Sequence, residues 1–587
     1  MGCVKKHLAT TGISEMWDLD SPEILFLGPW CFSEDRNRRL IEGRPYSIIP
    51  SPWKPAIKIK EAADLCNGIY VEIFYELTDR LNLLHSASYS QKYWRILIGP
   101  WLRYFIEILY ERYKRIENAF TLFPDIHTYV LPPTLCSLAT LDTYDFVSIR
   151  GKATEDYYNL KLFSLITRYL YPEKAIEKYN SLPSVEKVIG LKSKISKRLF
   201  YKANKVISLF FYPNVILSDM YHLDLTQILD LEFNSSLNRV IFDNFTDRSG
   251  ALKRVNYSQD FRHKLRFEGK YDKFNALLRQ LIPSAIPMCY VENFNKYRKK
   301  VKAVGVKVVG SAVGFYFNEN FKFFAAEETS RGVKLIDFQH GGGYGISLSC
   351  PAETTSLEKD VFYTWGWRSL NNKNTMPLAS PYLSRLRDNY KFTENNILFV
   401  GNNIHRYLNS FMTIFTPDDI PQYFLDKKRF VDVLGQSQRS ELLYRPYQEV
   451  GWNEVVVIKN LMPGISILSK GRLIDWMKKF KIVVIDHLST SNMEALVINV
   501  PTIWFWDPDI WLIRPEAEKY FDLLRDVGIL YNTPEEAARK VNEINDNPLN
   551  WWRDPKIQKA RDLFCNEFAL SSNNWREEWN KILNEYK

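Results

Sequence analysis

In much of this chain, short apolar runs alternate with stretches of helical spacing, and this alternation limits the fold more than any other feature. Runs rich in Val, Ile and Phe predict strands, whereas apolar residues three or four apart predict helices. We expect strands at residues 24–27, 288–291, 306–309, 333–337, 361–365, 397–400, 455–459, 482–486 and 502–506, with helices at 317–329 and 492–498. Strands that alternate with helices form parallel sheets covered by helices.

The chain has 587 residues, which is enough for more than one hydrophobic core. We expect an α/β protein built of two Rossmann-like domains. Residues 1–350 would form the N-terminal domain, with a helical insertion at about 60–220, and residues 351–554 would form the C-terminal domain. Residues 555–587 would be helices that pack back across the cleft. Ligands of such folds bind at the carboxyl ends of the strands.

Three adjacent hydroxyls stand where an expected strand passes into a helix. Ser489, Thr490 and Ser491 open this helix, so unpaired backbone N–H groups and the positive end of the helix dipole lie beside them. Such a helix start binds phosphate, and an N-cap alone needs only one hydroxyl. We expect these residues, together with His487 just before them, to bind an anion. Glu494 would either bind a ribose hydroxyl pair or act as the capping-box partner of the Ser491 amide.

Residues 338–345 form the most unusual segment, with four glycines in its last five positions. Glycines such as Gly341 and Gly342 let the backbone approach a ligand closely. His340, at the mouth of an expected parallel sheet, could take a proton from a hydroxyl near neutral pH or hold a phosphate. The structural alternative is a tight turn between domains with a satisfied histidine. We expect a functional loop, with His340 as a catalytic residue.

Two further strand ends would face the same cleft. Gly401 and Asn402 follow the expected strand at 397–400, and both are interpreted as ligand-binding residues. Arg445 follows the apolar run at 442–444 and would place a guanidinium on a phosphate or carboxylate. A surface ion pair is the alternative for this arginine, which we count as a catalytic residue.

The spacing of acidic residues and cysteines predicts neither a metal nor a cofactor for the reaction. Asp18-Leu19-Asp20 precedes any expected strand, and Asp507-Pro508-Asp509 lies in a proline turn. For Asp507 and Arg514 we favour a structural role. The seven cysteines are odd in number and widely spaced, as in a cytosolic protein with reduced thiols.

The net charge of +10 is concentrated at residues 187–205 and 296–307. A basic face can meet anionic lipid, nucleic acid or phosphorylated substrates, although a solvated helix face is the commoner explanation. No nucleic-acid-binding motif accompanies the charge, so we expect no nucleic-acid partner. The most hydrophobic windows, at 94–110 and 206–217, are interrupted by charged residues or proline, and no signal peptide is expected. We predict a cytoplasmic protein that can lie peripherally on the inner membrane surface.

Four segments resemble one bacterial family, and the similarity runs nearly end to end. They are Leu8-Ala9-Thr10-Thr11, Phe26-Leu27-Gly28-Pro29-Trp30-Cys31, residues 338–345 and residues 486–530. The family consists of uncharacterised transferases from surface-polysaccharide loci and was first catalogued in spirochaetes. The resemblance implies transferase activity and names no substrate.

A more distant similarity links the chain to CDP-glycerol glycerophosphotransferases and to capsule transferases that use CMP-activated ulosonic acids. In those enzymes a His-Gly turn closes the N-terminal half, a His-Pro pair lies on the C-terminal half, and a Ser-Ser or Ser-Thr helix start holds the donor phosphate. By position, His340 matches the first motif and the hydroxyls of Ser489, Thr490 and Ser491 match the third. Arg445-Pro446-Tyr447 replaces the second motif and contains no histidine.

Residues and resemblance together favour a GT-B-like glycosyltransferase of surface-polysaccharide synthesis. Its donor would be a nucleotide-activated sugar, such as a CMP-linked ulosonic acid, bound by the C-terminal domain. The N-terminal domain would bind a glycan or lipid-linked acceptor. Two alternatives stay open: a phosphotransferase that moves an alditol phosphate from a CDP donor, and a non-catalytic nucleotide- or glycan-binding protein. Analogy of fold alone does not separate them.

Overall fold

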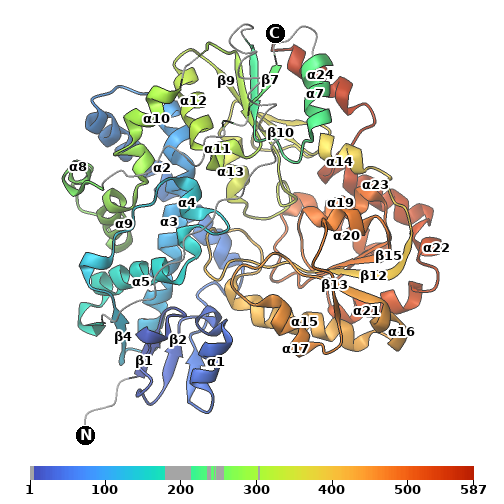
Figure 1. The fold of residues 1–587 in the computed structure, drawn as a ribbon, viewed down its shortest axis with the longest axis horizontal. Coiled ribbons are helices and arrows are strands. Elements are labelled where there is room, and N and C mark those ends of the chain that lie inside the picture. Colours follow the sequence, from blue (N-terminus) through green and yellow to red (C-terminus); the bar gives the residue numbers. More distant parts are fainter. Residues whose placement is uncertain are drawn as a thin grey trace.

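The computed structural model describes residues 6–178, 213–234, 240–243, 245, 257–301 and 304–586 (Figure 1). Within these residues the named strands pair only in parallel and form three separate sheets, one of five strands and two of six. The expected α/β class with parallel sheets is confirmed. The division into domains at residue 350 stays a prediction.

The sheet at the right of Figure 1 belongs to the C-terminal half, and its strand order is β14-β13-β12-β15-β16-β17. The order reverses between β12 and β15, and a ligand crevice forms at the carboxyl ends of the strands at such a point. Its strands are β12 (Glu394–Val400), β13 (Leu442–Arg445), β14 (Ser466–Ile467), β15 (Phe480–Ile485), β16 (Thr502–Phe505) and β17 (Leu530–Tyr531). Its main helices are α15 (Ile420–Val433), α16 (Gln436–Glu441), α17 (Glu454–Leu461), α19 (Thr490–Ile498), α20 (Pro515–Asp526) and α21 (Pro534–Ile544).

The second six-stranded sheet lies at the top of Figure 1, in the order β11-β10-β9-β8-β6-β7. Its strands are β6 (Val215–Ser218), β7 (Val240–Phe242), β8 (Val308–Ser311), β9 (Lys334–Phe338), β10 (Val361–Thr364) and β11 (Thr375–Pro377). The helices around it include α7 (Leu225–Asn234), α10 (Phe294–Lys300), α11 (Gly314–Phe317), α12 (Glu319–Thr329), α13 (Pro351–Leu357) and α14 (Pro381–Leu386). Two of its strands, β10 and β11, come after residue 350.

The third sheet is a feature that the sequence analysis did not foresee beyond one strand. It has the order β3-β2-β1-β4-β5 and lies at the bottom of Figure 1. Its strands are β1 (Lys6–Ala9), β2 (Ile24–Phe26), β3 (Tyr46–Ile48), β4 (Ile126–Val130) and β5 (Ala175–Glu177), and the long helices α2 (Ile57–His85), α3 (Gln91–Leu122) and α5 (Asp156–Leu170) accompany it. The region expected to be a helical insertion, at about 60–220, therefore supplies two strands of this sheet, β4 and β5, as well as β6 of the second sheet.

Six of the expected strands from residue 306 onward are present, and two others are wrong. The residues at 288–291 form a 3-10 helix, η6 (Met288–Tyr290), in which all three residues are buried. The apolar run that predicted a strand here therefore reflects burial alone. The residues at 455–459 belong to α17, in which the first residue, Glu454, and the fifth, Ile458, are buried. This spacing of four is helical, and the β-branched run around it concealed the period.

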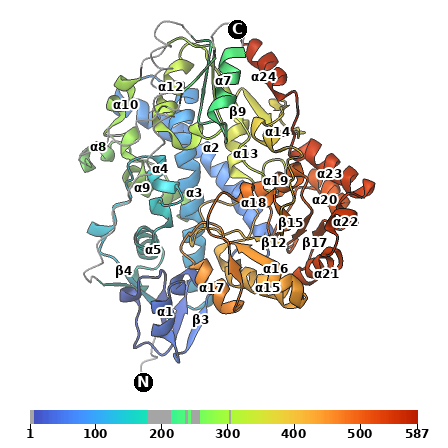
Figure 2. The same cartoon turned by 45° about the vertical axis from the view of Figure 1, so that its right-hand side comes forward.

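The last helices are α23 (Pro555–Phe568) and α24 (Trp575–Asn584). Figures 1 and 2 show α24 beside α7, at the second sheet. The Trp579 ring stacks on Phe338 of β9 at 4.9 Å between centroids, and its Nε1 donates to the Ala379 carbonyl at 2.8 Å. The Tyr363 and Tyr586 hydroxyls lie 2.9 Å apart. The end of the chain is thus packed against the sheet that carries residues 338–345.

A polar face of α3 holds the segment at 408–419, which follows β12. The buried Glu107 carboxylate accepts the backbone N–H of Phe411 at 2.7 Å. The buried Arg112 guanidinium donates to the Leu408 carbonyl at 2.6 Å. Backbone groups of an irregular segment need such partners when they are buried. The long N-terminal helix therefore fixes the path of a loop that belongs to the C-terminal half.

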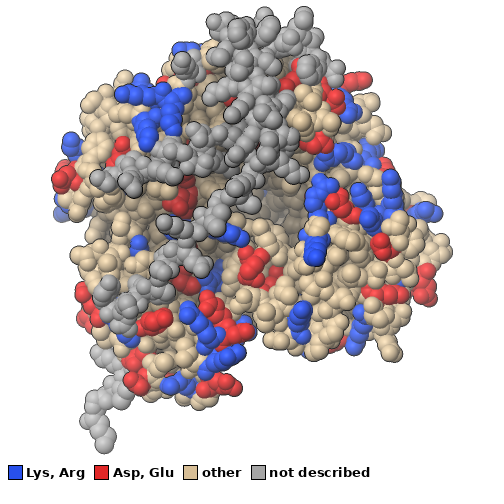
Figure 3. Space-filling view, viewed as in Figure 1, with Lys and Arg blue, Asp and Glu red and all other residues tan. Residues whose placement is uncertain are grey.

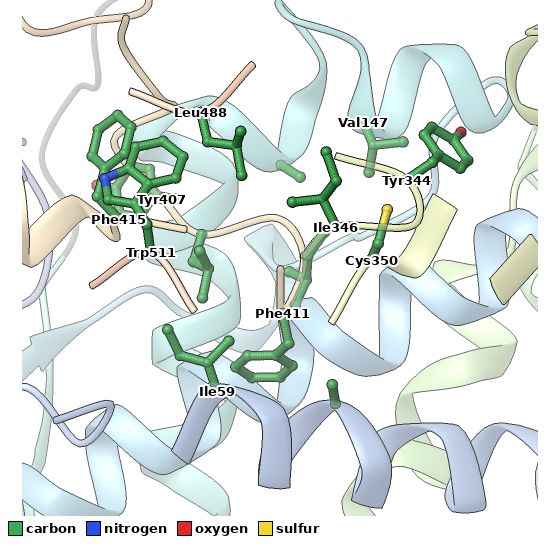
Figure 4. Packing of buried hydrophobic residues seen from close by; sticks show 14 of the residues in the cluster. Ile59, Val147, Tyr344, Ile346, Cys350, Tyr407, Phe411, Phe415, Leu488 and Trp511 are labelled. Carbon is green, nitrogen blue, oxygen red and sulfur yellow. The ribbon is translucent and has the colours of Figure 1, made fainter. Parts of the chain in front are cut away.

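Apolar side chains from the same regions meet around this loop. Figure 4 shows Phe411 beside Ile59 of α2, with Tyr344 and Cys350 on one side and Trp511 on the other. All five residues belong to one buried hydrophobic cluster. Removing this apolar surface from water is worth about 25 cal/mol per Å², so the cluster stabilises the junction between the parts of the chain.

Figure 3 shows Lys and Arg side chains gathered at the upper left, over α10. The last turn of α10 carries Arg298, Lys299 and Lys300, where positive charge complements the helix dipole. The other expected basic stretch, at 187–205, lies outside the described residues. No helix among the described residues combines the length and the apolar composition needed to cross a membrane.

The buried Glu107 predicts a pH-dependent stability. Burial raises the pKa of Glu107 to about 7, against the lowering effects of the Phe411 bond and Arg103. Between about pH 4.3, the value of a free glutamate, and pH 7, the folded chain keeps a proton that the unfolded chain has lost, so stability falls as the pH rises through this window.

We expect Glu107→Gln to raise the thermal unfolding midpoint by a few degrees at pH 8, because the amide cannot ionise yet can still accept the Phe411 N–H. At pH 4.5 the midpoint should match that of the wild type. Glu61→Gln, at an exposed position of α2, is the control and should change neither midpoint. An equal effect of Glu107→Gln at both pH values would contradict this account.

Candidate functional site

Two segments that the sequence singled out meet at one contact. The backbone N–H of Gly342 donates to the Thr490 hydroxyl at 3.1 Å. Gly342 lies in the loop after β9 of the second sheet, and Thr490 is the first residue of α19, beside the C-terminal sheet. The contact brings the loop that carries His340 against the helix start at which an anion is expected.

The close approach explains one of the two glycines. A Cβ at Gly342 would lie 2.7 Å from the Met493 sulfur and 2.8 Å from the carbonyl of Ser489. A Cβ at Gly341 would meet only the Tyr344 ring, at 3.6 Å, which is ordinary van der Waals contact. Gly342 is therefore needed for packing, whereas Gly341 is free of this constraint.

The three hydroxyls at the start of α19 have different partners. Ser489 is the N-cap: its hydroxyl accepts the Ser491 N–H at 3.2 Å, and its own N–H donates to the Asn492 side chain at 2.8 Å. The Thr490 hydroxyl accepts the Gly342 N–H. The Ser491 hydroxyl is half-buried and hydrogen-bonds to no described residue. One hydroxyl of the three thus has no structural partner within the described part of the chain.

Glu494 does not serve as the capping-box partner, because Asn492 occupies that position. Its carboxylate is buried and accepts the Tyr382 hydroxyl at 2.6 Å. Tyr221 packs edge-on against Tyr382, with 5.7 Å between ring centroids. Burial raises the pKa of Glu494 to about 7, so this carboxyl gains and loses a proton near neutral pH. The other interpretation of Glu494, as a ribose ligand, stays a prediction.

His340 is half-buried beside two tyrosines. Its ring nitrogens lie 3.1 and 3.2 Å from the Tyr344 hydroxyl, and the Tyr316 ring packs edge-on at 5.3 Å between centroids. Burial lowers the pKa of His340 to about 4, against the raising effect of backbone hydrogen bonds at Ala312 and Phe338. The imidazole is therefore uncharged at neutral pH. It brings no positive charge to a phosphate and is a weak base.

Beneath the carboxyl ends of the C-terminal sheet lies a buried ion pair between Lys427 of α15 and Asp486. Asp486 also accepts the Tyr423 hydroxyl at 2.6 Å and lies 3.0 Å from Nδ1 of His487. Tyr423 in turn accepts the backbone N–H of Asn402 at 2.9 Å. Although burial alone would raise it, Lys427 and His487 hold the pKa of Asp486 below its usual value. Two residues expected to bind ligand, Asn402 and His487, are thus parts of this buried network.

Gly401 is explained by packing as well. A Cβ at this position would overlap the hydroxyl of Tyr444, which donates to the buried carboxylate of Glu454. Burial raises the pKa of Glu454 to about 7. The glycine therefore lets β12 lie against a neighbouring buried polar group, and a role in ligand binding stays a prediction.

A cavity of about 440 Å³ opens beside the buried ion pair, at the carboxyl ends of β15, β16 and β17. Its lining includes Tyr423, Asp486, Trp506, Asp507, Trp511 and Asn532. This volume falls within the range of small-molecule sites. Carboxylates accept hydrogen bonds from hydroxyls, and aromatic faces pack on C–H groups. The mixture of rings and carboxylates is thus suited to a hydroxyl-rich ligand.

The sequence analysis missed the helical wall of this cavity. Gln422, Asp426 and Arg429 of α15 line it and were not anticipated, whereas Asp507 had been noticed with a structural role favoured. The three α15 residues stand four and three positions apart, so they lie on one face of the helix. A polar stripe on a helix between two strands is the signal that could have found them. Which way the stripe faces is decided by tertiary packing.

The backbone of Arg445 is next to one predicted site residue, since its carbonyl accepts the Gly401 N–H at 3.0 Å, but its side chain is directed to another loop. Its guanidinium donates to the carbonyls of Leu468 at 2.9 Å, Lys470 at 3.1 Å and Gly471 at 2.8 Å. Within the described chain, no hydrogen bond joins Arg445 to the His340 loop or to the start of α19. These contacts hold the loop at 468–471 and favour a structural role. Arg514, for which a structural role was expected, pairs with Glu353 at 3.0 Å.

Comparison with known proteins gives one family and several distant structural likenesses. A sequence model described as the LIC12162 family transferase matches residues 6–583. No curated protein matches the chain.

Among solved structures, the α,α-trehalose 6-phosphate synthase of Burkholderia multivorans is 8% identical at a TM-score of 0.35, over 64% of this chain and 97% of that one. Anabaena Alr3699/HepE, solved in complex with UDP-glucose, is 12% identical at 0.34, over 63% and 99%. Acinetobacter baumannii MurG is 9% identical at 0.32, over 64% and 99%. Only the family match bears on activity.

The two glycines of the loop provide a matched pair of variants. We expect Gly342→Ala to lower the thermal unfolding midpoint and to displace the His340 loop from α19, because overpacking of this kind costs about 1–3 kcal/mol. Gly341→Ala should leave the midpoint near that of the wild type. Differential scanning fluorimetry of the full chain measures both. Equal midpoints for the two variants would show that the contact between Gly342 and α19 is not tight.

Proposed function

Because the chain belongs to the LIC12162 family of transferases, we propose that it is a glycosyltransferase that uses a nucleotide-activated sugar in surface-polysaccharide synthesis. The observation that carries the proposal is the contact between Gly342 and Thr490. It joins a histidine loop on one sheet to a helix start on another, so donor and acceptor can be held on facing walls. Positioning of this kind is a large part of catalysis by transferases.

The donor phosphate would bind at the start of α19. The helix has nine residues, Thr490 to Ile498, and its dipole and first N–H groups favour an anion. The Ser491 hydroxyl adds a donor that no described residue uses. Ser489 and Thr490 act on this site indirectly, since one caps the helix and the other holds the loop at Gly342.

The hydroxyl-bearing part of the donor would lie in the cavity beside Asp486. This residue precedes the Ser489 cap by three positions, and the cavity offers the carboxylates of Asp426 and Asp507 with the ring of Trp506. Such groups bind sugar or ribose hydroxyls and pack on the ring carbons. A CMP-linked ulosonic acid is the donor class that the distant similarity suggests, and the acceptor would be a glycan or lipid-linked chain.

His340 would act as an uncharged hydrogen-bond partner at the mouth of the second sheet. With its pKa lowered to about 4, the imidazole is a poor general base near pH 7. Its contact with Tyr344 supports a role in positioning the loop and the donor. We therefore propose that His340 binds and orients the donor rather than acting as a general base.

A thermal-shift panel with CMP, CDP, UDP and GDP tests the proposal. A ligand that binds only the folded chain raises the unfolding midpoint by mass action, and one of these nucleotides should do so. Release of that nucleotide from its sugar conjugate, measured with glycan acceptors, then tests for turnover. A chain that responds to none of the four nucleotides is not the enzyme proposed.

Ser491 allows a sharper test of the phosphate site. We expect Ser491→Ala to weaken binding of the selected nucleotide about tenfold, since a hydrogen bond to a charged group contributes about 1–3 kcal/mol. The unfolding midpoint without ligand should stay unchanged, because the hydroxyl has no described structural partner. Ser489→Ala is the contrast, as loss of the cap costs about 1 kcal/mol and lowers the midpoint. Unaltered affinity in Ser491→Ala would remove this hydroxyl from the site.

His340→Ala separates the two roles of the histidine. We expect donor affinity and turnover to fall together, because the variant loses an orienting contact. A fall in turnover of about 10²–10⁴-fold with donor affinity intact would instead assign a general base. His263→Ala, at an exposed position, is the control and should behave as the wild type. Isothermal titration with the nucleotide and a nucleotide-release assay supply the two readouts.

A further inference from the structure

Three potential metal ligands meet on the five-stranded sheet of β1 to β5, and the proposed transfer reaction uses none of them. His7 of β1 and His127 of β4 are paired across the two parallel strands, so their side chains lie on one face of the sheet. Asp18 follows the turn at Ser14–Met16 and lies beside them. The ligand atoms that these three residues offer all lie within 4.8 Å of one another. No other group of this kind occurs among the described residues.

His7 supplies the strongest indication of a missing ligand. Its Nε2 lies 3.1 Å from the Met16 carbonyl oxygen, which can only accept a hydrogen bond, so Nε2 carries the proton. The lone pair of the neutral ring is then on Nδ1. This atom is buried and has no hydrogen-bond partner among the described residues. A buried acceptor without a partner costs about 1–3 kcal/mol.

The hydrogen bond from His7 to the Met16 carbonyl is of the kind that orients a metal-binding histidine. A histidine that binds a metal through one nitrogen donates its other N–H to a carbonyl or carboxylate, which fixes the tautomer and the ring orientation. Metal binding requires the neutral imidazole, and the Nε2–H donated to Met16 leaves the lone pair on the buried Nδ1.

The other two ligands are already close to the spacing of a metal site. Nε2 of His127 lies 3.4 Å from an Asp18 oxygen. Two ligands of a tetrahedral zinc ion are about 3.3 Å apart when the bonds are about 2.0–2.1 Å long. The side chains of His127 and Asp18 are 12% and 22% exposed, so they can close on an ion that enters from solvent. Lys178, a positive neighbour of His7, donates to the Trp17 carbonyl at 3.4 Å.

We propose that His7 Nδ1, His127 Nε2 and one Asp18 oxygen bind a single divalent transition-metal ion, with Zn²⁺ the best match. Two imidazoles and a carboxylate are among the ligand sets of zinc, with water in the fourth position. The ion would join β1, β4 and the loop that contains Asp18. It would therefore stabilise the five-stranded sheet of β1 to β5, whose strands have only three to five residues. This ion site lies outside the site proposed for transfer.

Titration of Zn²⁺ into the EDTA-treated, dialysed full-length chain tests the site. We expect one ion per chain by isothermal titration and a rise in the unfolding midpoint with Zn²⁺. Co²⁺ in place of Zn²⁺ should give the visible absorption bands of a tetrahedral site. A chain that binds no stoichiometric Zn²⁺ overturns the proposal.

The variants Asp18→Asn and His127→Gln locate the ion. Both residues are partly exposed, so the variants should fold, and circular dichroism checks this. Each should weaken Zn²⁺ binding at least 100-fold and abolish both the midpoint shift and the Co²⁺ bands. His263→Gln, at an exposed histidine elsewhere, should bind as the wild type does. Undiminished binding in Asp18→Asn and His127→Gln would place the ion elsewhere and overturn the assignment.

Discussion

The contacts between α3 and the segment at 408–419 set the position of the N-terminal helices relative to the C-terminal sheet. Arg115 forms an ion pair with Asp418 at 2.7 Å, and Arg112 and Glu107 bind backbone groups of the same segment. Burying charges costs several kcal/mol each unless partners satisfy them. Because these partners lie about 300 residues away in sequence, the cost is offset in only one arrangement of the N-terminal helices and the C-terminal sheet.

The candidate site depends on that arrangement. The His340 loop and the start of α19 belong to different sheets, and their contact at Gly342 forms only if the sheets face each other at one distance. The cluster in Figure 4, which includes Tyr344 and Trp511, maintains that distance from both sides. A loop with side chains larger than glycine at position 342 could not approach α19 so closely. The contact with α19 therefore needs both the long-range packing of the cluster and a glycine at position 342.

Much of the fold and of the candidate site could be predicted from the sequence. The same physical reasons explain which parts could not. The strand at 482–486 and the hydroxyls after it were recognisable because a fully buried strand is a continuous apolar run and a helix start has its own residue preferences. Most of the five-stranded sheet was not, because β3 and β5 are largely exposed and β4 alternates buried with half-buried residues, so none of these strands is a continuous apolar run. For Arg445 the residue type suggested phosphate binding, yet its partners are carbonyls of a loop whose position only the fold decides.

A raised pKa does not by itself identify a functional site in this protein. Burial raises the pKa of Glu107, Asp337, Glu454 and Glu494 alike to about 7. Glu107 anchors a loop and Glu454 accepts a tyrosine hydroxyl, so both have structural partners. Glu494 has the same pKa and differs only in standing one turn from the Ser491 hydroxyl. The position of a carboxyl at the strand ends where two sheets meet is therefore stronger evidence for a site than its raised pKa. A core of this size buries carboxyls wherever its long-range contacts need them.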